Sequence, residues 1–179
     1  MADMRAGTAT WFTTRPRVLA KQAIVVPQNN KDVSVILVDA GLPYIVVFDD
    51  DLGVSLDDLQ KLGPAAAQLS AAVSAAMPPS EFSVQEDLRA YLVMVMSRPF
   101  ESRVRVAWVS DQGQVANSAG GTGGLAVTAA LQALGLSAEG ATVTVEAPGG
   151  AFDCRIGPDG ASVLACVRII ASHTFFDAP

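Results

Sequence analysis

The segment best suited to chemistry is a glycine-rich stretch, residues 118–124 (Ser-Ala-Gly-Gly-Thr-Gly-Gly), followed directly by an apolar run, residues 125–134. That run predicts a helix ended by Gly135. The first turn of a helix has backbone N–H groups without internal partners, and glycines let an anion approach them closely. The stretch therefore predicts a site for a carboxylate or phosphate. A tight turn whose glycines serve only packing is the alternative, and the loop alone favours neither.

Six residues of this region are candidates for contact with an anionic substrate. Five could bind it through the backbone or a short side chain: Asn117, Gly120, Gly121, Thr122 and Gly123. The sixth, Ser118, is a candidate for a catalytic role, although a hydroxyl without an adjacent base is a weak acid and a weak base. Capping and turn hydrogen bonds are the alternative for both hydroxyls.

Three residues elsewhere could take part in the same chemistry. His173 is the only histidine, and imidazole is the side chain that exchanges protons near neutral pH. Asp39 stands at a strand end beside a turn, where functional residues gather. Arg5 could hold a carboxylate through forked hydrogen bonds. The alternative for each is a structural role, or a solvated side chain.

The sequence predicts neither a metal site nor a cofactor. One histidine is too few for the usual zinc sites. Asp49, Asp50 and Asp51 would not converge on one ion, because adjacent residues of a strand point to opposite faces. Cys154 and Cys166 stand in separate strand-like segments, and they fit free core thiols better than a disulfide.

Composition limits the class of protein. The chain has 179 residues, half of them hydrophobic, and we expect one domain over residues 1–179. A net charge of −6 and a pI near 4.6 argue against a nucleic-acid partner. No apolar run approaches the ~18 residues that a membrane span requires. We therefore expect a soluble, cytoplasmic protein without a membrane partner.

Hydrophobic alternation and turn residues predict an α+β fold. A helix is expected after Ser55, interrupted near Gly63 and Pro64 and resumed over residues 65–77. A second helix follows the glycine-rich stretch. The other elements are strands, expected at residues 8–12, 18–26, 33–38, 44–48, 88–96, 103–109, 142–146, 152–156, 163–170 and 173–176. One long apolar helix among many strands predicts a strongly curved antiparallel sheet or barrel around that helix.

Several segments, in order, resemble motifs of the diaminopimelate epimerase superfamily, in particular its methylaconitate isomerase (PrpF-like) branch. They are residues 39–53 (beginning Asp-Ala-Gly-Leu-Pro), 119–126 (Ala-Gly-Gly-Thr-Gly-Gly-Leu-Ala), 143–150 (ending Pro-Gly-Gly) and 166–179. Residues 4–12 faintly resemble the opening of that branch. The resemblance covers residues 32–179, and residues 1–31 contribute N-terminal strands.

The resemblance implies a β-barrel-like sheet around a central helix. Superfamily members usually have two such domains, with the active site between them, and this chain is long enough for about one. In those members, two cysteine thiols exchange a proton next to the substrate carboxylate, which helix N-termini hold. The second-domain cysteine falls on Gly120 here, the asparagine of the strand turn falls on Leu42, and the first-domain cysteine motif is absent. A two-cysteine mechanism therefore does not carry over.

We expect a cofactor-independent isomerase, tautomerase or cyclase acting on a small carboxylate or a related polar metabolite, recruited to specialised metabolism. A homodimer or a second subunit would complete the site. The alternative is a catalytically degenerate binding or partner subunit of the same fold. The missing cysteines favour the alternative, and the intact glycine-rich stretch favours the enzyme.

Overall fold

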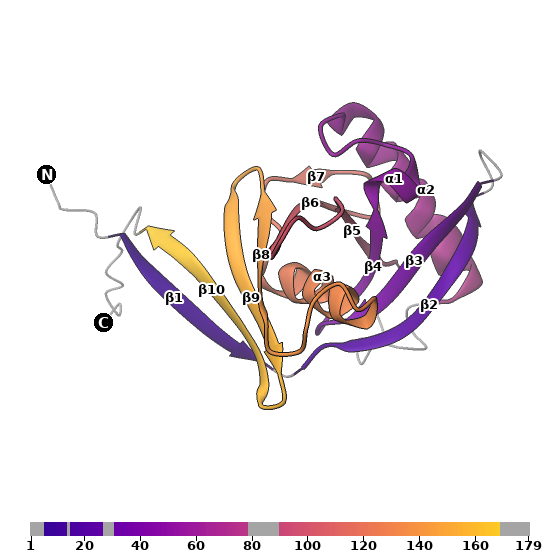
Figure 1. Ribbon diagram of the computed structural model, residues 1–179. Coiled ribbons are helices and arrows are strands. Elements are labelled where there is room, and N and C mark those ends of the chain that lie inside the picture. Colours follow the sequence, from indigo (N-terminus) through magenta and orange to yellow (C-terminus); the bar gives the residue numbers. More distant parts are fainter. Residues whose placement is uncertain (1–5, 14, 27–30, 79–89, 169–179) are drawn as a thin grey trace, which may run out of the picture.

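The computed structural model describes residues 6–13, 15–26, 31–78 and 90–168 (Figure 1). Its three helices are α1 (Asp49–Leu52), α2 (Leu59–Ala76) and α3 (Gly121–Ala133). Its ten strands are β1 (Ala6–Thr13), β2 (Arg17–Val26), β3 (Lys31–Asp39), β4 (Pro43–Phe48), β5 (Leu92–Met96), β6 (Arg103–Val109), β7 (Val115–Ala116), β8 (Thr142–Ala147), β9 (Gly150–Gly157) and β10 (Gly160–Arg168).

All ten strands form one sheet, which curves around α3 (Figure 1). The strand order is β1-β10-β9-β8-β6-β5-β4-β3-β2, and β7 pairs with β6 beside this path. The concave face packs on α3 in one apolar core, and the outer face of the β2–β6 part packs on α2 in a second core. The predicted α+β class and the sheet around a helix are confirmed.

The sheet is mixed rather than wholly antiparallel as predicted. Strand β4 is parallel to β5, and β6 is parallel to β8. Each parallel pair is joined by a long crossover, through α1 and α2 in the first case and through β7 and α3 in the second. Parallel neighbours require such crossovers, whereas two-residue turns join only antiparallel strands.

Strand β4 shows how the two cores share the sheet. All six of its residues are buried. Tyr44, Val46 and Phe48 face the core around α3, while Ile45 and Val47 face the core under α2. A strand covered on both faces is apolar throughout instead of alternating.

Helix α3 is buried over most of its length and ends as the sequence predicts. Gly135 has a φ of +72°, and its N–H donates to the Gln132 carbonyl at 3.0 Å. The Leu136 N–H donates to the Leu131 carbonyl at 2.9 Å, which completes a Schellman motif.

Helix α2 differs from its prediction in two respects. Its N-cap is Asp58, whose carboxylate accepts a hydrogen bond from the Lys61 N–H, and not Ser55. It also runs without interruption through Gly63 and Pro64. Its buried apolar residues are spaced for one continuous helix against the sheet: Leu62, Ala66, Leu69 and Val73. The free energy gained by burying them outweighs the loss of the hydrogen bond that proline removes.

Some predictions fall outside the described residues or are corrected there. The expected strand at residues 173–176 lies outside them, as do Arg5 and His173. Residues 49–51 form the turn of α1 rather than the end of a strand. Among the helices that the structure describes, none is both long and apolar enough to cross a membrane.

Candidate functional site

The first turn of α3 presents its amides without a side-chain cap. Gly120 precedes the helix with a φ of +66°, a conformation that suits glycine. The first intrahelical bond runs from the Gly124 N–H to the Gly120 carbonyl at 3.0 Å. The amides of Gly121, Thr122 and Gly123 therefore precede the helical ladder, at the positive end of the helix dipole. No acidic residue stands in this turn to compete with an anion.

Residues 117–123, which we call the glycine loop, are exposed where an anion would approach. Asn117, Ser118, Gly120 and Thr122 are exposed, whereas Ala119 is buried and anchors the loop. The Ser118 hydroxyl accepts a hydrogen bond from the Gly120 N–H at 3.2 Å. Ser118 thus stabilises the turn and keeps its own proton available for a ligand.

The turn between β8 and β9 borders the loop. The Gly149 N–H donates to the Asn117 carbonyl, and a Cβ on Gly149 would lie 2.7 Å from that oxygen. The pairing of Ala116 with Trp108 fixes the approach to the loop from the other side. The backbone around Asn117 is therefore held by two strand connections.

The sequence left two roles open for these glycines, anion binding and close packing, and the structure assigns different glycines to each. A Cβ on Gly124 would lie 2.7 Å from the Cys154 Sγ, and one on Gly123 would lie 3.0 Å from the Met94 Sδ. These two glycines permit close packing of the helix on the sheet. A Cβ on Gly120 would meet nothing within 4 Å, and one on Gly121 would make ordinary contact with Val163. Packing therefore does not require glycine at the exposed positions.

A buried tyrosine supports the loop from below. The Tyr44 hydroxyl lies 2.8 Å from the Thr122 Oγ1, and Tyr44 is 3% exposed. Burial raises the pKa of Tyr44, and the hydrogen bond with Thr122 opposes that rise. Sequence reasoning missed this residue, because nothing local connects two side chains 78 positions apart.

The Asp39 carboxylate is hydrogen-bonded to a neighbouring strand and to the turn that follows it. Its carboxylate accepts a hydrogen bond from Arg17 at 2.7 Å and another from the Gly41 N–H at 3.0 Å. The structure thus brings together the six candidates of the glycine loop. It places Asp39 at the end of β3, paired with Arg17 of β2.

The one thiol whose surroundings the structure describes lies under the helix. Cys154 is fully buried, and burial raises its pKa to about 12. Gly124 covers its sulfur. A thiol in this state is inert as a base or nucleophile near neutral pH. Among the described residues, no group of three or more potential metal ligands is present.

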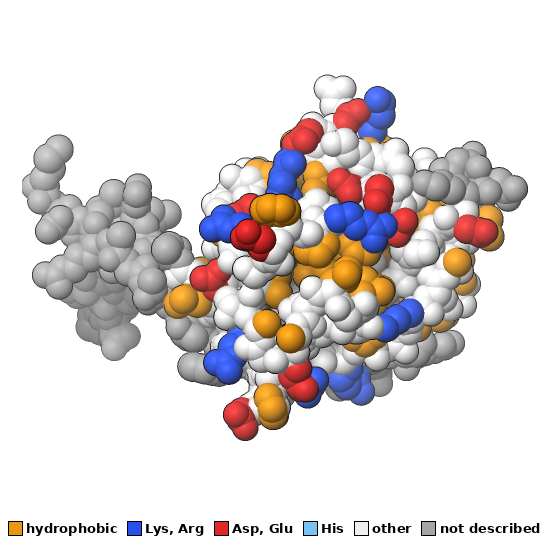
Figure 2. Space-filling view, in the orientation of Figure 1, with side chains coloured by type: hydrophobic (Ala, Val, Ile, Leu, Met, Phe, Trp, Pro, Cys, Tyr) orange, Lys and Arg blue, Asp and Glu red, His pale blue; other side chains and the backbone are white. Residues whose placement is uncertain are grey.

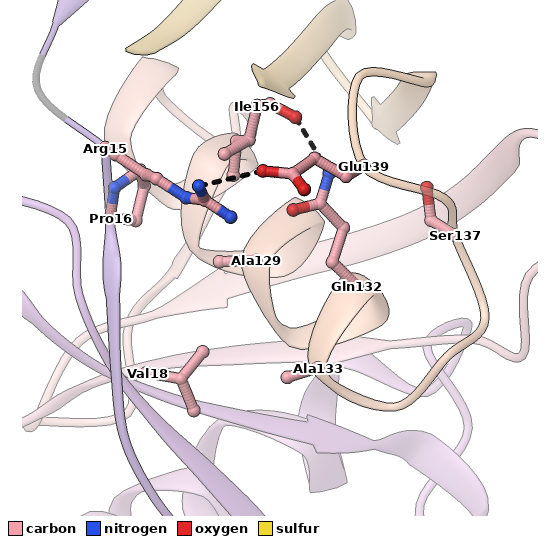
Figure 3. Close-up of a pocket in the computed structure, with 9 residues that line it drawn as sticks. All are labelled: Arg15, Pro16, Val18, Ala129, Gln132, Ala133, Ser137, Glu139 and Ile156. Atoms are coloured by element: carbon pink, nitrogen blue, oxygen red, sulfur yellow. Dashed lines mark hydrogen bonds and ion pairs between the residues drawn. The ribbon is translucent and has the colours of Figure 1, made fainter. Parts of the chain in front are cut away.

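A pocket of about 400 Å³ lies along the C-terminal half of α3 (Figure 3). Arg15 and Glu139 form an ion pair across it at 2.8 Å. Gln132 Nε2 donates to the Ile156 carbonyl at 3.0 Å. The ion pair ties the residues before β2 to the connection after α3, and the hydrogen bond ties α3 to β9. The pocket is separate from the glycine loop.

The sequence has no significant match among protein-family models or curated proteins. Solved structures do match. One is a probable proline racemase from Agrobacterium radiobacter K84 with bound carbonate: TM-score 0.77, 17% identity, 95% of this chain and 54% of that chain covered. Another is a hydroxyproline epimerase from Agrobacterium vitis with bound trans-4-hydroxy-L-proline: TM-score 0.74, 18% identity, 92% and 52% covered.

A methylitaconate-delta-isomerase is a more distant match, with a TM-score of 0.50, 15% identity, and 85% of this chain and 48% of that chain covered. The chain spans about half the length of these proteins. At such identities the likeness concerns the fold. The chain has the diaminopimelate epimerase-like fold that its motifs resemble.

Proposed function

We propose that this chain forms half of a cofactor-independent isomerase for small carboxylates, with the glycine loop holding the carboxylate. The observation that carries the proposal is the exposed, uncapped first turn of α3, which is free of acidic residues. Its likeness in fold to a racemase, an epimerase and an isomerase supports the same class of reaction.

The loop suits the charge that such a reaction develops. When a base removes the proton next to a carboxylate, the electron pair of the C–H bond moves onto the carboxylate oxygens. The amides of Gly121, Thr122 and Gly123 and the helix dipole would stabilise that charge. Thr122, held by Tyr44, and Ser118 would orient the substrate. Return of a proton to carbon completes an isomerisation, and a tautomerase or cyclase would begin in the same way.

The proposal requires a base from another part of the assembly. The described side chains found in contact with the glycine loop include no carboxylate or imidazole. We place a second copy of the chain, or a second subunit, opposite the loop, and its base would act on the bound substrate. His173 and Arg5 remain the proposed base and carboxylate ligand, and Asp39 a proposed catalytic group in spite of its Arg17 pair. We place the reaction in the cytoplasm, where a free thiol such as that of Cys154 persists.

A binding subunit without activity is the second candidate. Gly120 stands where the resembled motif has a cysteine, and Cys154 is inert. Such a subunit would keep the anion site and lend it to a catalytic partner.

Solution mass and proton exchange test the proposal together. Analytical ultracentrifugation at several concentrations should give a dimer. The dimer should then incorporate deuterium from D₂O next to the carboxylate of at least one member of a panel of small carboxylates. A dimer that binds carboxylates without exchange would favour the binding subunit.

Two variants locate the activity. Thr122→Val should lower exchange at least ~10-fold, as for loss of a charge-stabilising contact. Gly123→Ala should lower it as well, because its Cβ would lie 3.0 Å from the Met94 Sδ and would displace the first turn of α3. Thr142→Val, at an exposed threonine of β8, is the matched control and should leave exchange unchanged. Unchanged exchange in folded Thr122→Val and Gly123→Ala proteins would exclude the glycine loop as the site.

A further inference from the structure

A second hollow, of about 530 Å³, lies at the C-terminal end of α3, opposite the glycine loop. We call it the α3 C-terminal groove. Strands β2, β3 and β4 form its floor, and the residues that follow α3 form its wall. Figure 2 shows an apolar area on this face, bordered by basic and acidic side chains. The volume is in the range of small-molecule sites.

Apolar side chains line the wall of the groove and part of its floor. Ile36 and Val46 are cross-strand partners on the concave face, and Phe48 follows on the same face of β4. Leu134 and Leu136 form the wall and remain 38% and 46% exposed. Large aliphatic side chains at the surface gain free energy when an apolar body covers them. The groove is therefore suited to a compact hydrocarbon group.

The rim beside Phe48 carries a cation and an anion side by side. The Arg98 guanidinium lies 3.8 Å from the centre of the Phe48 ring. Its Nε and Nη2 donate to Asp50 at 3.0 and 3.1 Å, and its Nη2 lies 3.5 Å from Asp51 Oδ1. Its Nη1 takes part in none of these three contacts. Arg98 and Asp51 both line the groove.

The opposite side of the groove does not favour an anion. Lys21 stands two strands away from β4, and its ammonium donates to the Ala133 carbonyl at the end of α3. It thus balances the negative end of the helix dipole. The charges offered to a ligand are those of Arg98 and Asp51, which are opposite and adjacent.

We propose that the α3 C-terminal groove binds a small zwitterion with an apolar side chain, the chemistry of an apolar α-amino acid. The ligand carboxylate accepts from Arg98 Nη1, and the ammonium lies against the Asp51 carboxylate. The side chain lies against Leu134 and Leu136, over a floor that includes Ile36 and Phe48. The groove and the glycine loop are separated by the 13 residues of α3, about 20 Å of helix, so this site is independent of the proposed reaction.

Calorimetric titration with L-leucine and two truncated probes tests the proposal. L-leucine should bind saturably. The probe that lacks the ammonium, 4-methylpentanoate, and the probe that lacks the carboxylate, 3-methylbutylamine, should each bind at least ~5-fold more weakly, because each loses one charged contact. Absence of saturable leucine binding, or equal affinity for either probe, would overturn it.

Two substitutions assign the binding to the groove. Ser34 is an exposed residue of its lining, so Ser34→Phe should fill the groove without disturbing either core and abolish leucine binding. Asp51→Asn should weaken it about 5-fold, and Asp159→Asn, in the turn after β9, is the matched control. Thr122→Val should leave it unchanged. Leucine binding that survives both Ser34→Phe and Asp51→Asn, in proteins with native circular dichroism, would contradict the assignment.

Discussion

The phenol oxygen of Tyr44 lies 2.8 Å from the Oγ1 of Thr122, so strand β4 is hydrogen-bonded to the first turn of α3. Tyr44 is buried, whereas Thr122 is exposed at the mouth of the glycine loop. The hydrogen bond therefore fixes the Thr122 hydroxyl, which faces solvent in this helix turn, to a buried side chain of the core. A substrate that contacts Thr122 would meet a group with a fixed orientation.

Removal of this hydrogen bond should cost a modest amount of stability. Tyr44→Phe should lower the free energy of unfolding by about 1 kcal/mol, because the hydrogen bond is lost while water can still reach the Thr122 hydroxyl that remains. A double-mutant cycle with Thr122→Val, followed by urea unfolding, should give a coupling energy of about 0.5–1 kcal/mol. Strict additivity of the two substitutions would show that the bond does not form in solution.

The contact of Gly124 with Cys154 predicts a large loss of stability when one methyl group is added at Gly124. Gly124→Ala should destabilise the protein by about 1–3 kcal/mol, because its Cβ would lie 2.7 Å from the sulfur. Gly121→Ala, three residues earlier in the same helix, is the control and should be neutral or slightly stabilising, since its Cβ meets Val163 only at 3.8 Å. Thermal unfolding compares them. The cost of Gly124→Ala should largely disappear in a Cys154→Ala background, and its persistence there would refute the contact.

Cys154 should be unreactive in the native protein. Burial raises its pKa to about 12, so almost none of the reactive thiolate is present at pH 8. Iodoacetamide at pH 8 should modify Cys154 only after denaturant is added. Peptide mapping by mass spectrometry distinguishes it from Cys166, and rapid native labelling at Cys154 would argue against the helix lying over it.

The Arg98–Asp50 pair predicts a pH dependence of stability. The hydrogen bonds that Asp50 accepts from Arg98 hold the pKa of Asp50 below its ordinary value. The pair therefore stabilises the fold above pH ~4, and this contribution is lost as the pH falls through the folded-state pKa. Arg98→Gln should lower stability by less than about 1 kcal/mol at pH 7, because both side chains are more than half exposed.

The difference in stability between the wild type and Arg98→Gln should become smaller as the pH falls, without vanishing. The stacking of Arg98 on Phe48 persists at low pH, since the guanidinium stays charged. Urea unfolding at pH 7, 5 and 3 measures the trend. A gap between wild type and Arg98→Gln that widens toward pH 3 would be inconsistent with the depressed pKa.

Local sequence patterns predicted most of the elements and little of their pairing. Alternation over residues 103–109 predicts β6 with the bounds that the structure has, and Gly135 marks the end of α3 correctly. Strand direction is set by the crossovers, which leave no local signal, so the two parallel pairs were missed. Gly63 looks like a helix breaker in sequence, whereas in the fold it admits the backbone of Gly113, 50 residues away.

The candidate site shows the same division. The glycine loop was predicted as a unit, because helix physics gives its amides a role wherever the helix lies. The separate roles of its glycines follow from Met94 and Cys154, which reach them only through the fold. Tyr44 looked like one more apolar strand residue, and only the packing of β4 against α3 gives its hydroxyl a partner.

Binding of a carboxylate by the first turn of α3 is the central claim, and amide chemical shifts test it most directly. In ¹H–¹⁵N spectra of the full chain titrated with succinate, with sodium chloride matched for ionic strength, the amides of Gly121, Thr122 and Gly123 should shift saturably. The amides of Gly157, the last residue of β9, and Gly160, the first residue of β10, should not. Saturable shifts confined to the first turn would establish the anion site. Shifts that stay linear with concentration, or that are equal at Gly157 and Gly160, would contradict it.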